Sequence, residues 1–478
     1  MLTPKSWLSV CLTSYLLWVG STPAAALNLD LPDLNLPDIG GNTSPSIDMS
    51  AERELGIEIF RELRRTRPLI EDPELSDWIR ALGNRLARHS GNQGNLLFAI
   101  ENNAAINAHT LAGGVIIINS GLILNTQSES ELAAVMAHEI AHVSQRHIAR
   151  MVADNKNNAL LTGLGVLAGA AAASQSSDAS QAILTGAIAL QAHQQIAFSH
   201  RAEAEADRVG LRILAGAGFN PAAMPHFLEK LERSESSLYG DIGKYLQTHP
   251  LSIDRLSDTR SRANQLGNIK PREDSSYLFA REKLRILTGQ QAAPLQATIT
   301  AKYTKALQAA RANNPSAVLQ SLGTPDGNQA RLIPLALLRA EALNQTKRHP
   351  EAEQFLKTLQ SLYPGQEAVA QAIATSLAGS NKQEQALGAL SKVKLAENTS
   401  TEFLETAQRL AQQAGHLAEA SFYNAERSIR LGEYAHAKAT LEQALNLPDT
   451  PPHTLVKMRN RLRETEKMLA QENKPYPG

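Results

Sequence analysis

The stretch ESELAAVMAHEIAHVSQRHIARM (residues 129–151) has helical periodicity and contains the motif HEIAH at residues 138–142. Residues i and i+4 of a helix share one face, so His138 and His142 point the same way and can bind one zinc ion. Glu139 lies close to the metal without being a natural third ligand of the pair. Two nitrogen ligands and a carboxylate that takes a proton from water are what a zinc hydrolase requires. The stretch therefore predicts a helix that carries half of a metal site.

A catalytic zinc site takes three protein ligands and keeps one position for water. The helical stretch SHRAEAEAD (residues 199–207) supplies a candidate third ligand. Glu203 and Asp207 share one face, so Glu203 would bind the metal and Asp207 would hydrogen-bond a ligand histidine and orient it. Glu205 is the rival ligand, and because it lies roughly opposite Glu203, only one of the two can face the metal. Alone, this run of acids indicates a solvated helix face, but paired with the first helix it predicts a complete site.

HEIAH followed by EAEAD, an E-x-x-A-D pattern, resembles the Ste24/HtpX-type zinc metallopeptidases. The segments around residues 107–114 and 119–122 also match that family, although Ala112 stands where a proline often precedes the paired glycines. The resemblance implies one zinc ion on His138, His142 and Glu203, with Glu139 as catalytic base. It also implies a catalytic, proton-donating role for Asp207, for which the spacing argument favours an orienting role.

The segment Thr248-His249-Pro250 matches a T-H-P segment of the family. His249 could reach the zinc as a fourth, regulatory ligand and displace the water, which would give an inhibited resting state. The alternative is a turn histidine that caps a helix. The remaining histidines near these motifs are interpreted as surface residues: His109, His147, His193 and His200.

The composition predicts a mainly α protein. The 478 residues carry 47 basic and 47 acidic side chains and only 4% aromatics, which favours helices and gives no indication of a nucleic-acid partner. Residues 96–101 and 115–119 are strand-like, with a turn-rich connector between them. We therefore expect an α+β, zincin-like peptidase domain with a small sheet over residues 50–288. We expect its second strand to pair with extended substrate through Val115, Ile116, Ile117 and Ile118.

Residues 1–26 have the pattern of a cleaved secretory signal, with Lys5, an apolar run and a small-residue site ending at Ala26. The only cysteine, Cys11, lies inside this segment, so the mature chain would contain no disulfide. Residues 27–49 are rich in proline and predict an extended leader. We expect export to the periplasm of a Gram-negative bacterium.

Two apolar runs follow the HEIAH helix, at residues 159–173 and 182–190. They predict either a membrane hairpin, with small residues at the helix contact, or a soluble or interfacial hairpin. The longer run falls short of the roughly 20 residues that a spanning helix needs, which favours the second interpretation and leaves peripheral membrane contact open.

Residues 298–472 have a helical pattern throughout. Ala352, Ala386 and Ala420 occupy equivalent places in three helix starts, at a spacing of about 34 residues, which is the tetratricopeptide period. The sequence therefore predicts an α-solenoid with a concave surface for protein partners. Residues 432–445 resemble the second helix of the repeat but fall at a half-period, so the phase of the last repeats stays open.

The family resemblance implies a periplasmic endopeptidase, and a chaperone, that acts on misfolded or stalled outer-membrane proteins and contacts their assembly machinery through the repeats. One alternative is a non-proteolytic chaperone or scaffold with a capped zinc site. Another is a membrane-anchored protease that uses residues 159–190.

Overall fold

The computed structural model describes residues 49–91, 96–154, 200–235, 243–270, 275–290, 299–324, 332–448 and 450–472. These residues belong to one compact unit, Ile39–Lys474. The predicted signal peptide, the leader up to residue 48 and the 159–190 hairpin lie outside the described residues. Within the described ranges, no helix combines the length and the apolar character needed to cross a membrane.

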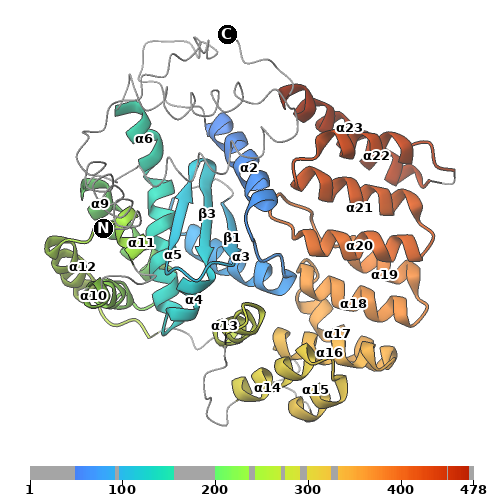
Figure 1. Cartoon of the computed structure of the whole chain (residues 1–478), viewed down its shortest axis with the longest axis horizontal. Helices are drawn as coiled ribbons and strands as arrows, with labels where there is room; N and C mark the ends of the chain where they lie inside the picture. The colour runs from blue at the N-terminus through green and yellow to red at the C-terminus, as the bar shows by residue number, and fades with distance from the viewer. Residues whose placement is uncertain are drawn as a thin grey trace, which may run out of the picture. The chain divides into compact units, whose positions relative to one another are not determined.

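A three-stranded sheet lies at the centre of the N-terminal half (Figure 1). Its strands are β1 (Leu97–Glu101), β2 (Ala108–Leu111) and β3 (Val115–Asn119), in the order β1-β3-β2. β1 runs parallel to β3, and β2 runs antiparallel to it. The sequence analysis predicted β1 and β3 but not β2, because the short segment beside the paired glycines resembles a turn.

Both faces of the sheet are buried. Phe98, Ile100, Ile116 and Ile118 belong to the main core with α3 (Pro73–Ala87) and α5 (Glu129–Ser144). The alternate residues of the same strands, Leu97, Ala99, Val115 and Ile117, pack against α2 (Met49–Thr66). Side chains alternate between the two faces of a strand, and a strand buried on both faces is apolar throughout.

The prediction that Val115 to Ile118 form a substrate-binding edge is wrong. β3 is hydrogen-bonded to β1 on one side and to β2 on the other, so its backbone groups are used within the sheet. The four side chains are at most 1% exposed. The sheet edge on the side of α5 is β2, which packs against that helix.

The HEIAH helix is shorter than its periodicity predicted. α5 starts at the cap residue Ser128, whose side chain accepts a hydrogen bond from the amide of Glu131. It ends at Ser144, and Arg146 adopts a left-handed conformation with φ 52° before α6 (His147–Asp154) begins. Short helices link the other parts of this half: 3-10 helix η2 (Ala112–Gly114) and α4 (Ser120–Asn125).

Helix α9 (His200–Gly216) crosses α5 at very close range. Gly210 allows this approach, since a Cβ there would stand 3.2 Å from the backbone of His138. The helices that follow are α10 (Ala223–Glu235), α11 (Gly243–Thr248), α12 (Ile253–Leu266) and α13 (Ser276–Leu287). α13 contributes Leu284 to the main core and Phe279 to the first core of the following helices, so it joins the two halves.

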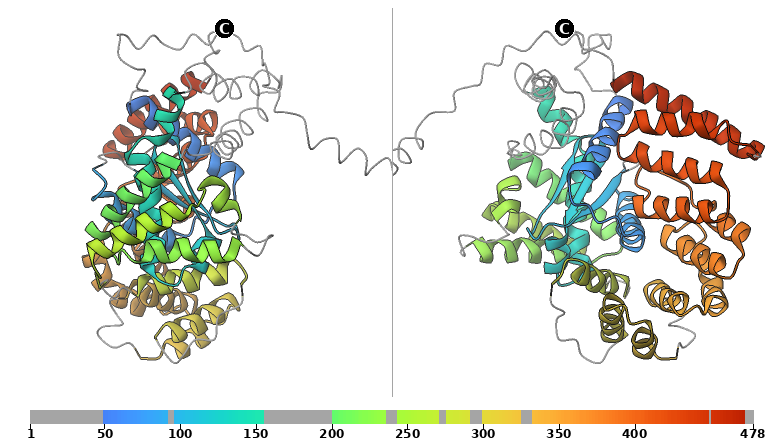
Figure 2. Two further views of the ribbon diagram at one scale, coloured as in Figure 1. Left: turned by 90° about the vertical axis from the view of Figure 1, so that its left-hand side faces the viewer. Right: turned by 45° about the vertical axis from the view of Figure 1, so that its right-hand side comes forward.

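The C-terminal half is a stack of helical hairpins (Figures 1 and 2). The first helices start at regular intervals of about 34 residues, and a left-handed residue recurs at the same interval in each turn, at Asn313, Lys347, Asn381 and Gly415. The first helices are α14 (Ile299–Arg311), α16 (Ile333–Gln345), α18 (Glu367–Gly379) and α20 (Thr401–Gln413). The second helices are α15 (Pro315–Leu322), α17 (His349–Leu362), α19 (Gln383–Leu390) and α21 (Leu417–Arg430). The predicted sequence period is therefore a structural period.

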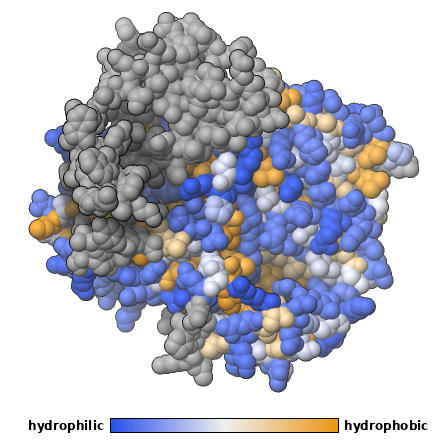
Figure 3. All heavy atoms as spheres, viewed as in Figure 1, coloured by the Kyte–Doolittle hydropathy of each residue, from blue (hydrophilic) through white to orange (hydrophobic). Residues whose placement is uncertain are grey.

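The structure also resolves the phase of the last hairpin. α22 (Tyr434–Ala444) starts almost one full interval after α20, so it is a first helix, with α23 (Pro452–Glu472) as its partner. The resemblance of residues 432–445 to a second helix was therefore misleading. Over the hairpins, the face in Figure 3 is largely hydrophilic with apolar residues in small groups. The apolar side chains are mostly gathered in a core between the helices, which holds the buried Ala352, Ala386 and Ala420.

Candidate metal centre

Helix α5 places its two motif histidines side by side in the interior. His138 is 3% exposed and His142 1%, and their Nε2 atoms lie 3.0 Å apart. The helix is buried all round because the sheet, α3, α9 and α10 surround it. Two imidazole nitrogens held this close in a dry site share either a proton or a metal ion.

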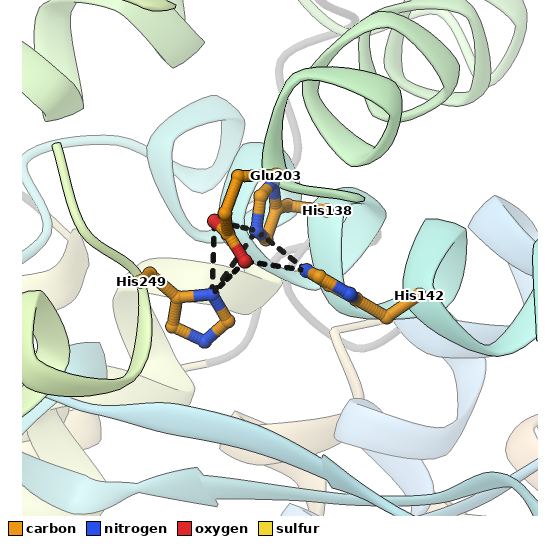
Figure 4. Close-up of side chains that lie close together, drawn as sticks. All are labelled: His138, His142, Glu203 and His249. Atoms are coloured by element: carbon orange, nitrogen blue, oxygen red, sulfur yellow. Dashed lines mark hydrogen bonds and ion pairs between the residues drawn. The ribbon is translucent and has the colours of Figure 1, made fainter. Parts of the chain in front are cut away.

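Helix α9 supplies the third group, as the spacing predicted. The carboxylate of Glu203 lies 3.4 Å from Nε2 of His138 and 3.4 Å from Nε2 of His142 (Figure 4). Glu203 has no exposed surface, and its rival Glu205 does not reach this cluster.

His249, just past the end of α11, completes a group of four. Its Nδ1 lies 3.3 Å from Nε2 of His138 and 3.2 Å from both carboxylate oxygens of Glu203 (Figure 4). Its ring stacks on the buried Tyr245, with centroids 4.7 Å apart. The backbone amide of His249 also donates to the carbonyl of Tyr245 at 2.8 Å. His249 thus lies just past the end of a helix, as the turn interpretation expected, and it also reaches the cluster, as the ligand interpretation expected.

The four residues fit a zinc ion. Three imidazole nitrogens and a carboxylate are typical zinc donors, and bonds of roughly 2.0–2.2 Å in a tetrahedron place donor atoms about 3.3–3.6 Å apart. Neighbouring donor atoms here are separated by 3.0–3.4 Å. All four ligand atoms lie within 4.8 Å of one another.

Charge in the cluster is arranged for a cation. Burial lowers the pKa of His138, but hydrogen bonds to Asp207 and Glu203 prevail and raise it to about 10. Burial opposes ionisation of Glu203 too, yet the charges of His249 and His138 hold its pKa well below the usual range. Burial and the neighbouring His138 keep the pKa of His142 well below its usual value. A proton on His138 thus takes the place that a metal ion would take, and metal binding would release it.

The carboxylate of Glu139 points at the cluster of His138, His142, Glu203 and His249 without belonging to it. The hydroxyl of Thr110 on β2 donates to Oε2 of Glu139 at 2.9 Å. Its other oxygen, Oε1, is buried, accepts no hydrogen bond within the described part of the chain and lies 3.4 Å from Nε2 of His249. Burial raises the pKa of this carboxyl. One oxygen is therefore anchored while the other faces the site.

Asp207 touches a ligand histidine and not the centre of the cluster. Its carboxylate lies 3.0 Å from Nδ1 of His138 and binds the guanidinium of Arg255 through both oxygens, at 2.8 and 2.9 Å. Arg255 also lies 3.0 Å from Glu203 and donates at 2.6 Å to the carbonyl of Pro250. Both oxygens of Asp207 thus bind Arg255, and one of them also contacts His138, the contact that the spacing argument expected.

The prediction that the remaining histidines lie on the surface is wrong for two of them. His147 is 3% exposed, and its Nδ1 lies 2.9 Å from Nδ1 of His142. His109 is buried on β2, and burial lowers its pKa to about 4. His193 and the side chain of His200 lie outside the described residues.

Sequence reasoning did not identify three further residues of the site. Thr110 lies in the strand that was interpreted as a turn, and Tyr245 has no distinguishing neighbours in sequence. Arg255 follows His249 closely, on the next helix, which was a usable signal, because a buried acid pair needs a cation nearby.

Comparison with known proteins agrees with this geometry. A profile of peptidase family M48 matches residues 73–263, which contain all four residues of the cluster. The beta-barrel assembly-enhancing protease of Yersinia pestis is 34% identical over 391 residues, covering 81% of this chain and 76% of that protein. The protein of the same name from Escherichia coli (strain K12) is 36% identical over 313 residues, 65% of this chain and 64% of that protein. This chain thus spans slightly under two thirds of the Escherichia coli relative. With its zinc-compatible donor set, the chain belongs to peptidase family M48 and is a zinc-dependent metallopeptidase.

Proposed function

We propose that the protein is a periplasmic endopeptidase that hydrolyses misfolded or stalled outer-membrane proteins. The observation that carries the peptidase chemistry is the buried cluster of His138, His142 and Glu203 with Glu139 directed at it. The choice of substrate follows the printed name of the relatives, which are beta-barrel assembly-enhancing proteases.

In this proposal His138, His142 and Glu203 hold the zinc. A bound zinc ion would supply Lewis acidity for the scissile carbonyl and for a water molecule. Glu139 accepts the proton of that water at Oε1 and passes it to the leaving amine, while Thr110 fixes its orientation. Burial raises the pKa of this carboxyl, which strengthens it as the base that accepts the proton. Asp207 orients His138 and does not touch the substrate.

His249 is proposed as a fourth donor that caps the site at rest. A catalytic zinc keeps one position for water, and Nδ1 of His249 competes for that position. Its ring and its chain segment are held by stacking on Tyr245 and by Arg255, so uncapping requires the segment after α11 to move.

The hairpins of residues 299–472 are proposed to be tetratricopeptide repeats that bind protein partners, including the outer-membrane assembly machinery. Support comes from the regular period in helix starts and left-handed turn residues. A chaperone activity is proposed for the same hairpins. Export to the periplasm is proposed from the signal pattern of residues 1–26. The division into a peptidase domain over 50–288 and a repeat domain over 298–472 also stays a proposal, since α13 packs into both cores.

Metal analysis tests the centre directly. The purified mature chain is expected to hold close to one zinc per chain by emission spectrometry, and His138→Ala is expected to lose it. Glu139→Gln should keep the metal and lose cleavage of casein by about two orders of magnitude or more. Zinc near zero in the wild type would contradict the metal site, and persistent cleavage by Glu139→Gln would contradict the assigned base.

Two alternatives have their own tests. A non-proteolytic scaffold with a closed four-ligand zinc site predicts no casein cleavage from any variant, including His249→Ala. A protease anchored through residues 159–190 predicts that sodium carbonate leaves the protein in the membrane fraction.

A further inference from the structure

We propose that His147 and Glu205 form a relay that orients His142, so that both are positioning residues for the metal centre. The inference rests on the proposed role of His142 as a zinc ligand. It assigns a function to two residues that the mechanism above does not use. On the side of its ring that faces away from the cluster, His142 contacts His147.

The ring contacts determine where the protons are. Nε2 of His142 faces His138 and Glu203, so this nitrogen binds the metal and Nδ1 carries the proton. Nδ1 of His142 lies 2.9 Å from Nδ1 of His147, which must then accept that hydrogen bond. A neutral His147 consequently carries its own proton on Nε2, which lies 3.2 Å from Oε2 of Glu205.

The relay behind His142 ends in an arginine, and so do the contacts behind His138, the other histidine of the motif. Arg150 donates to Oε2 of Glu205 at 3.1 Å from two nitrogens. On the other side of the cluster, His138 contacts Asp207 directly and Arg255 holds Asp207. Each histidine of the HEIAH motif is thus backed by an arginine-bound carboxylate, directly for His138 and through one imidazole for His142.

The end of helix α5 before His147 makes the contact between His147 and His142 possible. On one continuous helix a residue five positions after His142 would point about 140° away from it. The left-handed Arg146 ends the helix, and His147 turns back toward His142 at the start of α6. His147 is buried and contacts His142, while Glu205 is partly exposed and contacts His147. The imidazole of His147 therefore links the carboxylate of Glu205 to the ring of His142.

Substitutions at His147 separate hydrogen bonding from packing. His147→Leu fills much of the space without an acceptor and is expected to weaken zinc binding about 10–100-fold, measured by competition with a chelator. His147→Asn keeps an acceptor oxygen near the place of Nδ1 but loses the contact with Glu205, so it is expected to lose about as much as Glu205→Gln and less than His147→Leu. The visible spectrum of the cobalt-substituted protein is expected to change in His147→Leu and not in His147→Asn.

A matched pair of carboxylates supplies the control. Glu205→Gln removes the negative charge from the ion pair that Glu205 forms with Arg150, which is linked to the relay. The side chains of Arg150 and Glu205 are 55% and 37% exposed. Asp258→Asn removes a charge at the Arg208 pair, also 3.1 Å long and exposed by 52% and 36%. Asp258 also accepts from Arg262 on its own helix, and it has no relay contact. Glu205→Gln is expected to weaken zinc binding about threefold to tenfold, and Asp258→Asn to leave it unchanged.

Three results would overturn the relay: wild-type zinc affinity in His147→Leu, equal losses in His147→Leu and His147→Asn, or equal effects of Glu205→Gln and Asp258→Asn. The unfolding midpoints of the metal-free variants check folding, and if His147→Leu does not fold, the carboxylate pair decides. Zinc retained by His138→Ala would contradict the proposed metal site itself, whatever the relay variants show.

Discussion

At the scale of single residues, we propose that His249 decides whether the metal centre is open. Its Nδ1 lies as close to Glu203 as a shared zinc ion would place it, at 3.2 Å. Removing this donor opens the fourth position for water. We therefore expect His249→Ala to raise casein cleavage on the order of tenfold and to bind zinc more weakly than the wild type.

The control for that substitution is His226→Ala, which removes an exposed histidine on α10 that does not belong to the cluster. It should leave both cleavage and zinc affinity as they are. If His249→Ala shows no cleavage while it still binds zinc, the scaffold alternative explains the site better than the peptidase proposal does.

The residues that sequence spacing identified share one property: they lie one helical turn apart on the same helix. This holds for His138 and His142, and for Glu203 and Asp207, and both pairs meet in the structure as expected. Thr110 and Arg255 reach the site from other elements, and nothing in their local sequence specifies which helix or strand packs beside them.

At the scale of elements, the turns of the hairpins show how a repeat tolerates different residues at one strained position. Lys347, Asn381 and Gly415 all have positive φ at equivalent places, although only glycine adopts this conformation without strain. Lys347 is exposed, so its side chain does little to offset that strain.

We expect Lys347→Gly to raise the free energy of unfolding by about 1 kcal/mol, measured by urea denaturation. The matched control is Lys357→Gly, also exposed, in the interior of α17, where glycine should lower stability by about 1 kcal/mol. If both substitutions destabilise the protein equally, the left-handed turn is not the source of strain.

The end of α5 could not be predicted in the same way. Helical periodicity continues through residue 151, and Arg146 is not a residue that usually ends a helix. The break depends on tertiary contacts: Arg146 binds Glu52 at 2.9 Å and His147 binds His142. Local sequence therefore predicted a long helix, and packing divided it in two.

At the scale of the whole molecule, charged contacts join α3 to the hairpins. Arg80 on α3 binds Glu367 at the start of α18, at 2.8 Å, and also pairs with Asp77. Asp77 accepts the amide hydrogen of Ala368 at 3.0 Å. Burial, together with the nearby negative charge of Glu367, outweighs Arg80 and raises the pKa of Asp77 to about 6.

This shift makes the contact between α3 and α18 dependent on pH. The folded protein binds a proton at Asp77 more tightly than the unfolded chain does, for which the pKa is about 3.9. The resulting stabilisation is complete below about pH 3.9 and is lost as the pH rises through about 6. Asp77→Asn cannot ionise and keeps one of the two acceptor oxygens. We expect it to gain stability relative to the wild type, by up to roughly 3 kcal/mol, as the pH rises from below about 3.9 to 7.5.

Urea denaturation at pH 5 and pH 7.5 measures the effect, and the advantage of Asp77→Asn should be smaller at pH 5. The control is Asp258→Asn, at a largely exposed arginine pair away from this contact, whose effect should be small at both values. A difference between Asp77→Asn and wild type that does not change with pH would show that the Asp77 carboxylate stays ionised throughout.

The sequence by itself determined the parts of this protein that follow from local spacing. These are the helical class, the small sheet, the two motif helices, the period of the hairpins and the chemistry of a zinc metallopeptidase. The elements and the motif pairs depend on residues a few positions apart, whose relative directions are set by the geometry of one helix or strand. The period depends on the same pattern recurring about every 34 residues.

Only the tertiary structure decided the relations between elements. It placed β3 in the middle of the sheet, brought His249 to the metal cluster and turned His147 from the expected surface to the ring of His142. It also joined α3 to the hairpins through buried charges. Most of these contacts connect residues far apart in the chain, and the packing of many apolar side chains selects them. Even the local turn of His147 toward His142 follows Arg146, which binds the distant Glu52.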